Sequence, residues 1–255
     1  LGKAVVPVLD RTNKSGPWPV IYNQEVTLAL VGMHVVGTVN SHPEMVWSTF
    51  EQVDKVPDNA YVYNVSNSTT KTQAYNSTGK DWNFLPEGAP LPQAITANGV
   101  TKTASNSSLT AEVVCVTDAS NQCIPDAISA NDVARIDAFG NLHGSAAGST
   151  AVSNTTDLVS INVSVLSQLA AGDVRGNYIQ TGGIWTVDGQ IPAGGTDASL
   201  RGSLNLANTT LETYYQYPSP PFTPKNCFGC HGSTPSDATG ISHVFDEIAP
   251  LPKKQ

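Results

Sequence analysis

The residues with the clearest chemical potential lie near the C-terminus, where Cys227, Cys230 and His231 form a C-x-x-C-H motif. Two thiols separated by two residues can each form a thioether with one vinyl group of a haem, and the adjacent imidazole can then ligate the iron. The motif predicts one covalent haem c, with Cys227 and Cys230 as its attachment residues and His231 as an axial ligand.

Three other chemistries use a C-x-x-C pair: thiol redox exchange, zinc binding and a structural disulfide. A thioredoxin-like pair opens a helix after a strand in a βαβ unit, whereas this pair follows the proline-rich run 217–224. A tetrahedral zinc site needs further Cys or His at short spacing, but the other two cysteines, Cys115 and Cys123, lie far upstream. The spacing therefore favours haem attachment.

The motif does not specify the second axial ligand of the iron. Residues 232–255 contain no Met, which excludes the typical small cytochrome c layout, in which an axial Met follows the motif. His243 is the first candidate, because the connection from His231 reaches about 35 Å when extended and can pass round the haem edge. His42 and His143 lie in polar stretches, and we expect both to be solvated.

His34 is the alternative distal ligand. It lies in an apolar run between Gly32 and Gly37, where the absence of side chains would let a flat ring approach the backbone. The other interpretation is a core histidine bonded to a carbonyl group. Met33 and Met45 are lesser candidates, and strand alternation should place Met33 on the opposite sheet face from His34.

Composition excludes several classes of partner. Lys and Arg number 13 against 21 Asp and Glu, which gives a formal net charge of −8. Because no basic cluster is present to neutralise phosphates, we expect no nucleic-acid binding. No apolar run is long enough for a transmembrane helix. The acidic surface instead favours a redox partner protein with a basic docking patch.

The remaining cysteines and the N-terminus indicate an exported protein. Cys115 and Cys123 form an even pair whose spacing suits a hairpin disulfide, which belongs in an oxidising compartment; two buried thiols are the alternative. The chain starts at Leu1 with neither a basic nor an apolar leader region, so we expect a processed product. Because haem c is attached outside the cytoplasm, the predicted location is periplasmic or extracellular, in a bacterium.

The order of apolar and polar stretches predicts mainly strands in the first half. The β-branched run 26–39 predicts one long strand buried on both faces, or two strands bent at a glycine. Residues 45–51 predict the next strand. The polar stretch 58–108 predicts long ordered loops, which are uncommon unless functional or packed against something.

In the second half, residues 124–138 and 157–170 predict two helices, and 178–189 predicts a hairpin around Gly182 and Gly183. We see no repeat and no linker. The predicted fold is a single α+β domain over 1–255, β-rich with long loops and a few short helices. Residues 218–255 would form a C-terminal haem-attachment segment packed on it, unlike the small all-α cytochrome c.

Five stretches of the chain, taken together, resemble a family of exported bacterial proteins usually labelled only "cytochrome c family". These stretches are 30–36, 43–54, 206–214, 226–231 and 242–245. The resemblance reaches both ends of the chain and leaves out residues 60–140. It implies one covalent haem, makes His34 and His243 positions shared with the family, and implies little about activity.

Three functions are compatible with these features. The first is an exported monohaem electron-transfer protein with bis-histidine ligation by His231 and either His243 or His34. The second is a haem enzyme of peroxidase or oxygenase type with an open sixth position, in which His34 would act as acid and base. The third is a structural subunit that self-associates in a larger extracellular assembly. Parsimony favours electron transfer, because the few basic residues offer no distal Arg–His pair.

Overall fold

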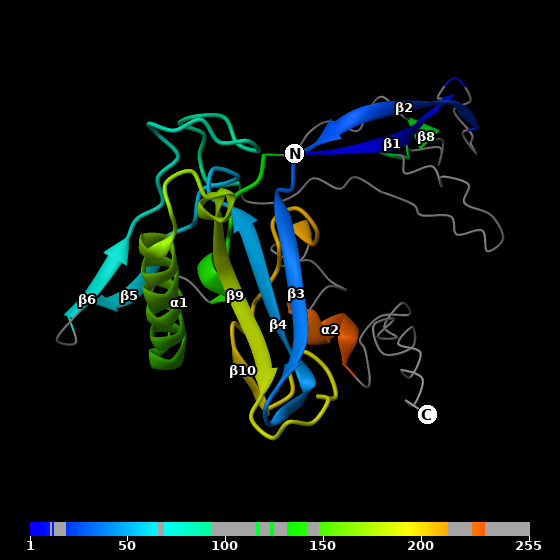
Figure 1. Cartoon of the computed structure of the whole chain (residues 1–255). Helices are drawn as coiled ribbons and strands as arrows, with labels where there is room; N and C mark the ends of the chain where they lie inside the picture. The colour runs from blue at the N-terminus through cyan, green and yellow to red at the C-terminus, as the bar shows by residue number, and fades with distance from the viewer. Residues whose placement is uncertain are drawn as a thin grey trace, which may run out of the picture. The chain divides into compact units, whose positions relative to one another are not determined.

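The computed structural model describes residues 1–10, 12, 19–65, 69–92, 116–117, 123–124, 132–141, 148–213 and 226–232. They form the predicted β-rich α+β fold, unlike an all-α cytochrome (Figure 1). Contacts divide the chain into two compact units, 1–30 with 94–132 and 31–93 with 133–255. The expectation of one domain over 1–255 did not anticipate this division. Among the described helices, none is long and apolar enough to cross a membrane.

The first unit contains two small antiparallel ladders. Strand β1 (Gly2–Leu9) pairs with β2 (Val20–Leu28), and β7 (Val116–Thr117) pairs with β8 (Cys123–Ile124). Cys115 lies outside the described residues, as does the side chain of Cys123, so the predicted disulfide stays a prediction.

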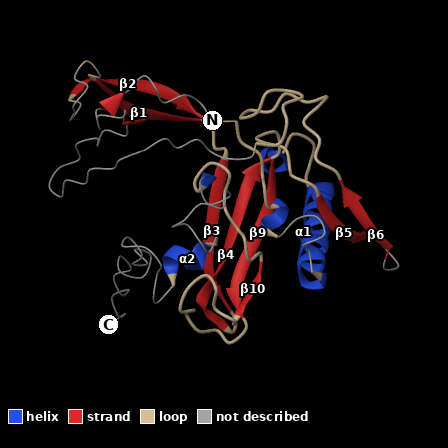
Figure 2. Ribbon diagram, turned by 180° about the vertical axis from the view of Figure 1, so that it is seen from behind, coloured by secondary structure: helices blue, strands red, loops and turns tan. Residues whose placement is uncertain are grey.

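The second unit is built on a four-stranded antiparallel sheet in the order β10-β9-β4-β3 (Figures 1 and 2). Its strands are β3 (Gly32–Val39), β4 (His42–Gln52), β9 (Tyr178–Thr186) and β10 (Leu200–Gly202). Alternation along β4 buries Trp47, Thr49 and Glu51 on one face. This face carries the candidate site.

The apolar run 26–39 contributes to two strands, which confirms the prediction of two strands over that of one long strand. Strand β2 ends at Leu28 and β3 begins at Gly32, and the two belong to different units. Burial on both faces is wrong: β2 is largely exposed, and β3 alternates between half-buried and exposed residues. The β-branched composition indicated a strand but not how many of its faces are covered.

The hairpin predicted around Gly182 and Gly183 is instead one continuous strand, β9. Gly182 is required for close packing rather than for a turn. A Cβ atom there would lie 2.3 Å from Leu206 Cδ1 and 2.9 Å from Ser203 Oγ. Paired glycines therefore mark a place where another segment approaches the strand.

Two helices accompany the sheet. Helix α1 (Ser149–Gln168) lies along β9, and α2 (Cys227–His231) lies near β3 and β4 (Figures 1 and 2). Helix α1 confirms the predicted helix at 157–170 and starts earlier. The predicted helix 124–138 is wrong where it is described, because residues 132–137 form no helical turn and only a short 3-10 helix, Ala138–Gly140, follows them. There Arg135 N donates to Pro57 O at 2.9 Å, and Arg135 O accepts from Asn59 N at 2.9 Å.

The polar stretch 58–108 contains a hairpin that the sequence did not predict. Strand β5 (Tyr61–Val65) pairs with β6 (Thr69–Gln73), and helix α1 packs on β5. Residues 74–92 lack strands and helices, as predicted.

Candidate functional site

The C-x-x-C-H motif forms a single capped helical turn, α2. The turn begins at Asn226, whose Oδ1 accepts a hydrogen bond from the backbone N–H of Phe228 at 3.1 Å. This is the usual role of an N-cap asparagine. The other end of the same side chain, Nδ2, donates to the carbonyls of Gly195 at 2.8 Å and Leu204 at 2.9 Å. Asn226 thus both starts the turn and ties it to the loops around β10.

Phe228 fastens the turn to the sheet. Its side chain is fully buried in an apolar cluster with four other residues: Trp47, Ile184, Leu200 and Leu206. The rings of Phe228 and Trp47 meet edge to face, with centroids 5.9 Å apart. An aromatic pair of this kind contributes about 0.5–1.5 kcal/mol beyond the area that it buries. The turn therefore has a fixed place on β4 and β9.

The three chemical groups of the motif share one side of this turn. Cys227, Cys230 and His231 stand at positions i, i+3 and i+4, which are neighbours on a helix surface. All three are partly buried. The imidazole of His231 stacks on the indole of Trp47, with centroids 4.6 Å apart and planes inclined at 28°. Trp47 thereby restricts the orientation of the imidazole.

Both cysteines of the motif are thiols rather than a disulfide. Burial, together with the negative charge of Glu212 and the neighbouring Cys230, raises the pKa of the Cys227 thiol to about 12. A catalytic redox pair requires the opposite shift, a lowered pKa that provides thiolate at neutral pH. The environment of Cys227 does not favour thioredoxin-like chemistry.

These residues fit a c-type haem in the chemistry of their donors. Two thiols and one imidazole on a single turn are the set that two thioethers and one axial bond require. The surroundings are apolar and aromatic, because Val36, Met45 and Cys227 all pack against the cluster that contains Trp47. An apolar and aromatic surface of this kind suits contact with the hydrophobic face of a porphyrin.

His34 does not offer a nitrogen lone pair to a metal in this structure. Its Nε2 lies 2.7 Å from Glu212 Oε1 and its Nδ1 lies 2.8 Å from Thr49 Oγ1. Since a carboxylate only accepts hydrogen bonds, Nε2 carries the proton and donates it to Glu212. Iron ligation by His34 would have to break one of these bonds, and the role of distal ligand stays a prediction.

The other candidates divide between described and undescribed parts of the chain. His243 and His143 lie outside the described residues. His42 was expected to be solvated in a loop, but it begins β4 half-buried, with Nδ1 2.9 Å from Glu44 Oε1. Met33 is exposed on the face opposite His34, as alternation predicted. Met45 packs against the same apolar cluster as Cys227, so it remains the methionine candidate on the motif's side of the sheet.

Beside the motif lies a buried charged network that the sequence did not reveal. The carboxylate of Glu51 has no exposed surface and lies 2.9 Å from Arg135 Nη2 and 3.3 Å from Lys55 Nζ. Thr209 donates to it twice, from its backbone N–H at 2.9 Å and from its hydroxyl at 2.6 Å. Arg135 also pairs with Asp58. No local pattern marks Arg135 as a partner of Glu51, because the two residues lie 84 positions apart in sequence.

A turn at residues 208–212 connects this network to the motif. The buried Asn208 Oδ1 accepts from Lys55 Nζ at 3.0 Å and from the backbone N–H of Thr210 at 2.9 Å. Glu212 Oε2 in turn accepts from the backbone N–H of Asn208 at 2.8 Å. This capping arrangement fixes Glu212 where it bonds His34, and after burial its charge is the next cause of the raised pKa of Cys227.

Four of the stretches that carry the family resemblance fall within this site, at least in part. Strands β3 and β4, the turn 206–213 and α2 all belong to the second unit and contact one another through the apolar cluster and the Glu51 network. Comparison of the chain with protein-family models, curated proteins and solved structures finds no match. The resemblance therefore stays a prediction.

Proposed function

We propose that this chain is an exported monohaem c-type cytochrome that transfers electrons. The observation that carries the proposal is the capped turn α2, on which Cys227, Cys230 and His231 share one side beside the Trp47 ring. Haem bound there would supply a one-electron iron couple. An exported location follows from the proposal, because haem c is attached outside the cytoplasm.

Each residue of the turn has a separate task. Cys227 and Cys230 would hold the haem through thioethers, and His231 would ligate iron. Trp47 would fix the plane of the His231 imidazole, as outer partners of metal ligands do. Asn226 and Phe228 keep the turn on the sheet while the haem is attached.

For the second axial position we propose His243 in preference to His34. Both ring nitrogens of His34 are already hydrogen-bonded, to Thr49 and Glu212. Bis-histidine ligation gives a low-spin iron with no open position for peroxide or oxygen. This ligation supports electron transfer over the enzymatic alternative.

The redox partner would carry a basic docking surface. With a net charge of −8, the chain attracts cationic proteins at long range, and this attraction weakens as salt screens it.

Haem attachment tests the proposal directly. The protein is produced in a bacterial periplasm with a c-type maturation system, and covalent haem is measured by haem staining after denaturing electrophoresis. We expect one haem per wild-type chain and none after the joint change Cys227→Ser and Cys230→Ser. The matched control, Cys115→Ser with Cys123→Ser, should keep its haem. A wild-type chain without covalent haem would overturn the proposal.

A further inference from the structure

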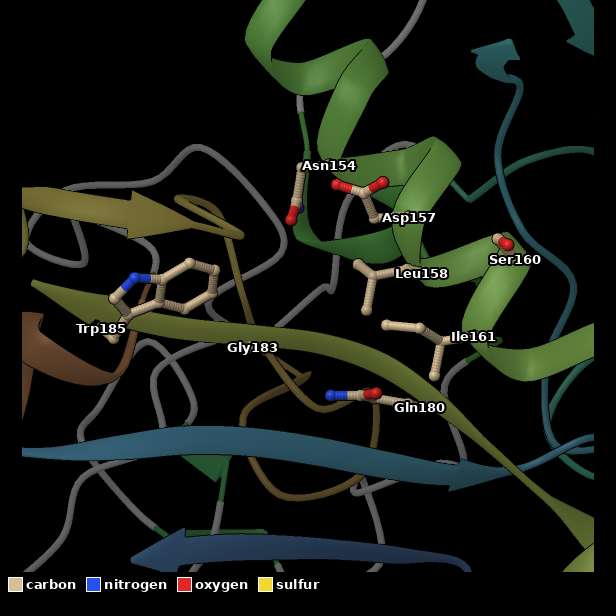
Figure 3. Close-up of a pocket in the computed structure, with 8 residues that line it drawn as sticks. All are labelled: Asn154, Asp157, Leu158, Ser160, Ile161, Gln180, Gly183 and Trp185. Carbon is tan, nitrogen blue, oxygen red and sulfur yellow. The ribbon is translucent and has the colours of Figure 1, made fainter. Parts of the chain in front are cut away.

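A second concave site lies on the other face of the central sheet. It is a pocket of about 400 Å³ between helix α1 and strand β9 (Figure 3). Gly183 and Trp185 line it, and both alternate along β9 with Ile184, which belongs to the cluster under α2. Because neighbouring residues of a strand point to opposite faces, the pocket is separate from the proposed haem site.

The apolar part of the pocket is provided by both elements. Figure 3 shows Leu158 and Ile161 reaching from α1 toward β9, with the Trp185 indole at one end of the space. Leu158 is buried, whereas Ile161 keeps 46% of its surface exposed. A partly open apolar surface beside an indole suits the carbon chain of a small ligand.

The orientation of the Asn154 amide follows from its hydrogen bonds. Asn141 Nδ2 donates to the carbonyl of Phe139 at 3.1 Å, so the Oδ1 of Asn141 must act as an acceptor. Asn154 Nδ2 donates to that oxygen at 3.3 Å and to Ser203 Oγ at 3.0 Å. Both donors of Asn154 are therefore used within the protein, and its Oδ1 is left for the pocket.

The orientation of the Gln180 amide also follows from its hydrogen bonds. The hydroxyl of Ser48 donates to the carbonyl of Gly182 at 3.2 Å, so it must accept the bond from Gln180 Nε2 at 2.6 Å. The Oε1 of Gln180 then remains an acceptor.

Asp157 adds a formal negative charge at the rim. Its carboxylate is exposed and, within the described part of the chain, has no ion-pair partner. Arg201 lies opposite Trp185 on the neighbouring strand β10, and its Nη1 donates to the carbonyls of Ala198 at 2.9 Å and Leu200 at 2.7 Å. The guanidinium is thus held along its own strand and does not line the pocket.

We propose that this pocket binds an organic cation, namely an alkyl amine whose ammonium group faces Asp157. An ammonium group offers three donors and no acceptor, which complements the carboxylate and the oxygens of Asn154 and Gln180. The indole of Trp185 attracts cations through its ring face.

Calorimetric titration of the purified full-length protein with 1,5-diaminopentane tests this proposal, independently of haem. We expect saturable binding of one amine per chain. Asp157→Asn keeps the shape of the side chain and should weaken binding by roughly 5- to 10-fold, because it replaces a charge-assisted hydrogen bond with a neutral one. The matched control Asp81→Asn removes the same charge from another exposed position and should leave the affinity unchanged.

Two results would overturn the proposal. One is the absence of saturable binding up to about 10 mM amine, the range of the weakest specific ligands. The other is equal affinity for the neutral isostere 1,5-pentanediol, or for the Asp157→Asn and wild-type proteins, since either would show that the charge is not recognised.

Discussion

At the scale of single residues, His34, one of the two histidines considered for the distal side of the iron, is already held by hydrogen bonds. His34 is bonded through both ring nitrogens, and its partner Glu212 is itself fixed by the backbone of Asn208. On the proposed ligation, removing this bonded imidazole would change the neighbourhood of the haem without removing a ligand. His34 would then be a positioning residue, and His243 the ligand.

The proposed ligation of iron by His243, and not by His34, predicts opposite results for two substitutions. His34→Gln should leave the ferric haem low-spin, because glutamine can still bond Glu212 and Thr49. His243→Ala should convert the haem to a high-spin form that binds cyanide readily, since the sixth position becomes open. Electron paramagnetic resonance of the two oxidised variants measures this. High-spin iron in His34→Gln, with low-spin iron kept in His243→Ala, would reverse the assignment.

At the scale of elements, the contact between β9 and the segment after β10 depends on Gly182. Any side chain there meets Leu206 Cδ1 at 2.3 Å and Ser203 Oγ at 2.9 Å, whereas the nearest atom to a Cβ at Gly183 is 3.6 Å away. Gly182→Ala should therefore lower the free energy of unfolding by about 1–3 kcal/mol through overpacking. The neighbouring Gly183→Ala should change it by less than about 0.5 kcal/mol.

Urea denaturation of the two alanine variants and the wild type gives these differences. Adjacent positions in one strand share strand propensity and the loss of backbone freedom, so the comparison isolates the contact with Leu206 and Ser203. Equal midpoints for the two variants would contradict the close approach of that segment to β9.

These elements also show how far sequence reasoning reaches. Strand structure within 26–39 and 45–51 and a helix at 157–170 are predicted from β-branched composition and apolar periodicity, and β3, β4 and α1 confirm these elements with different bounds. A pair of glycines such as 182–183 has the same sequence pattern in a turn as in a strand that packs closely against another segment. Only the tertiary contact with Leu206 distinguishes the two.

The candidate site likewise contains residues that the sequence predicts and contacts that only tertiary folding determines. Cys227, Cys230 and His231 could be found from spacing alone, because one helical turn determines their relation. Trp47 could not be assigned to His231 from sequence, since their contact depends on how α2 packs. The pairing of Glu51 with Arg135 is likewise set by tertiary folding.

At the scale of the whole second unit, Glu51 joins three segments distant in sequence: β4, residues 132–141 and the turn 208–212. Burial by itself would raise the pKa of this carboxyl, but the charges of Arg135 and Lys55 and the bonds from Thr209 outweigh it and hold the pKa below 4.5. A carboxyl with a lowered folded-state pKa stabilises the fold fully above its unfolded pKa. That stabilisation is lost as pH falls through the folded value.

We therefore expect Glu51→Gln to lower the free energy of unfolding by about 3–5 kcal/mol at pH 7, because Lys55 loses its buried counter-charge and Arg135 keeps only its pair with Asp58. The deficit should shrink as pH falls from the ordinary glutamic acid pKa through the lower folded-state pKa of Glu51, where the wild type loses the same charge. Urea denaturation at a series of pH values measures both effects.

The control is Asp54→Asn, which removes the partner of Lys80 in an exposed ion pair of 2.5 Å. An exposed pair contributes about 0–1 kcal/mol, so this variant should differ little from wild type. A Glu51→Gln deficit that stays constant from pH 7 to pH 3 would contradict the assigned role of the Glu51 charge.

The most direct test of the proposed bis-histidine haem c is the low-temperature electron paramagnetic resonance spectrum of the oxidised protein, recorded with its absorption spectrum. We expect covalent haem c with low-spin ferric iron and without the methionine-to-iron absorption band. That band would identify Met45 or Met33 as the ligand and would contradict bis-histidine ligation. High-spin iron would contradict an electron carrier with both axial positions filled.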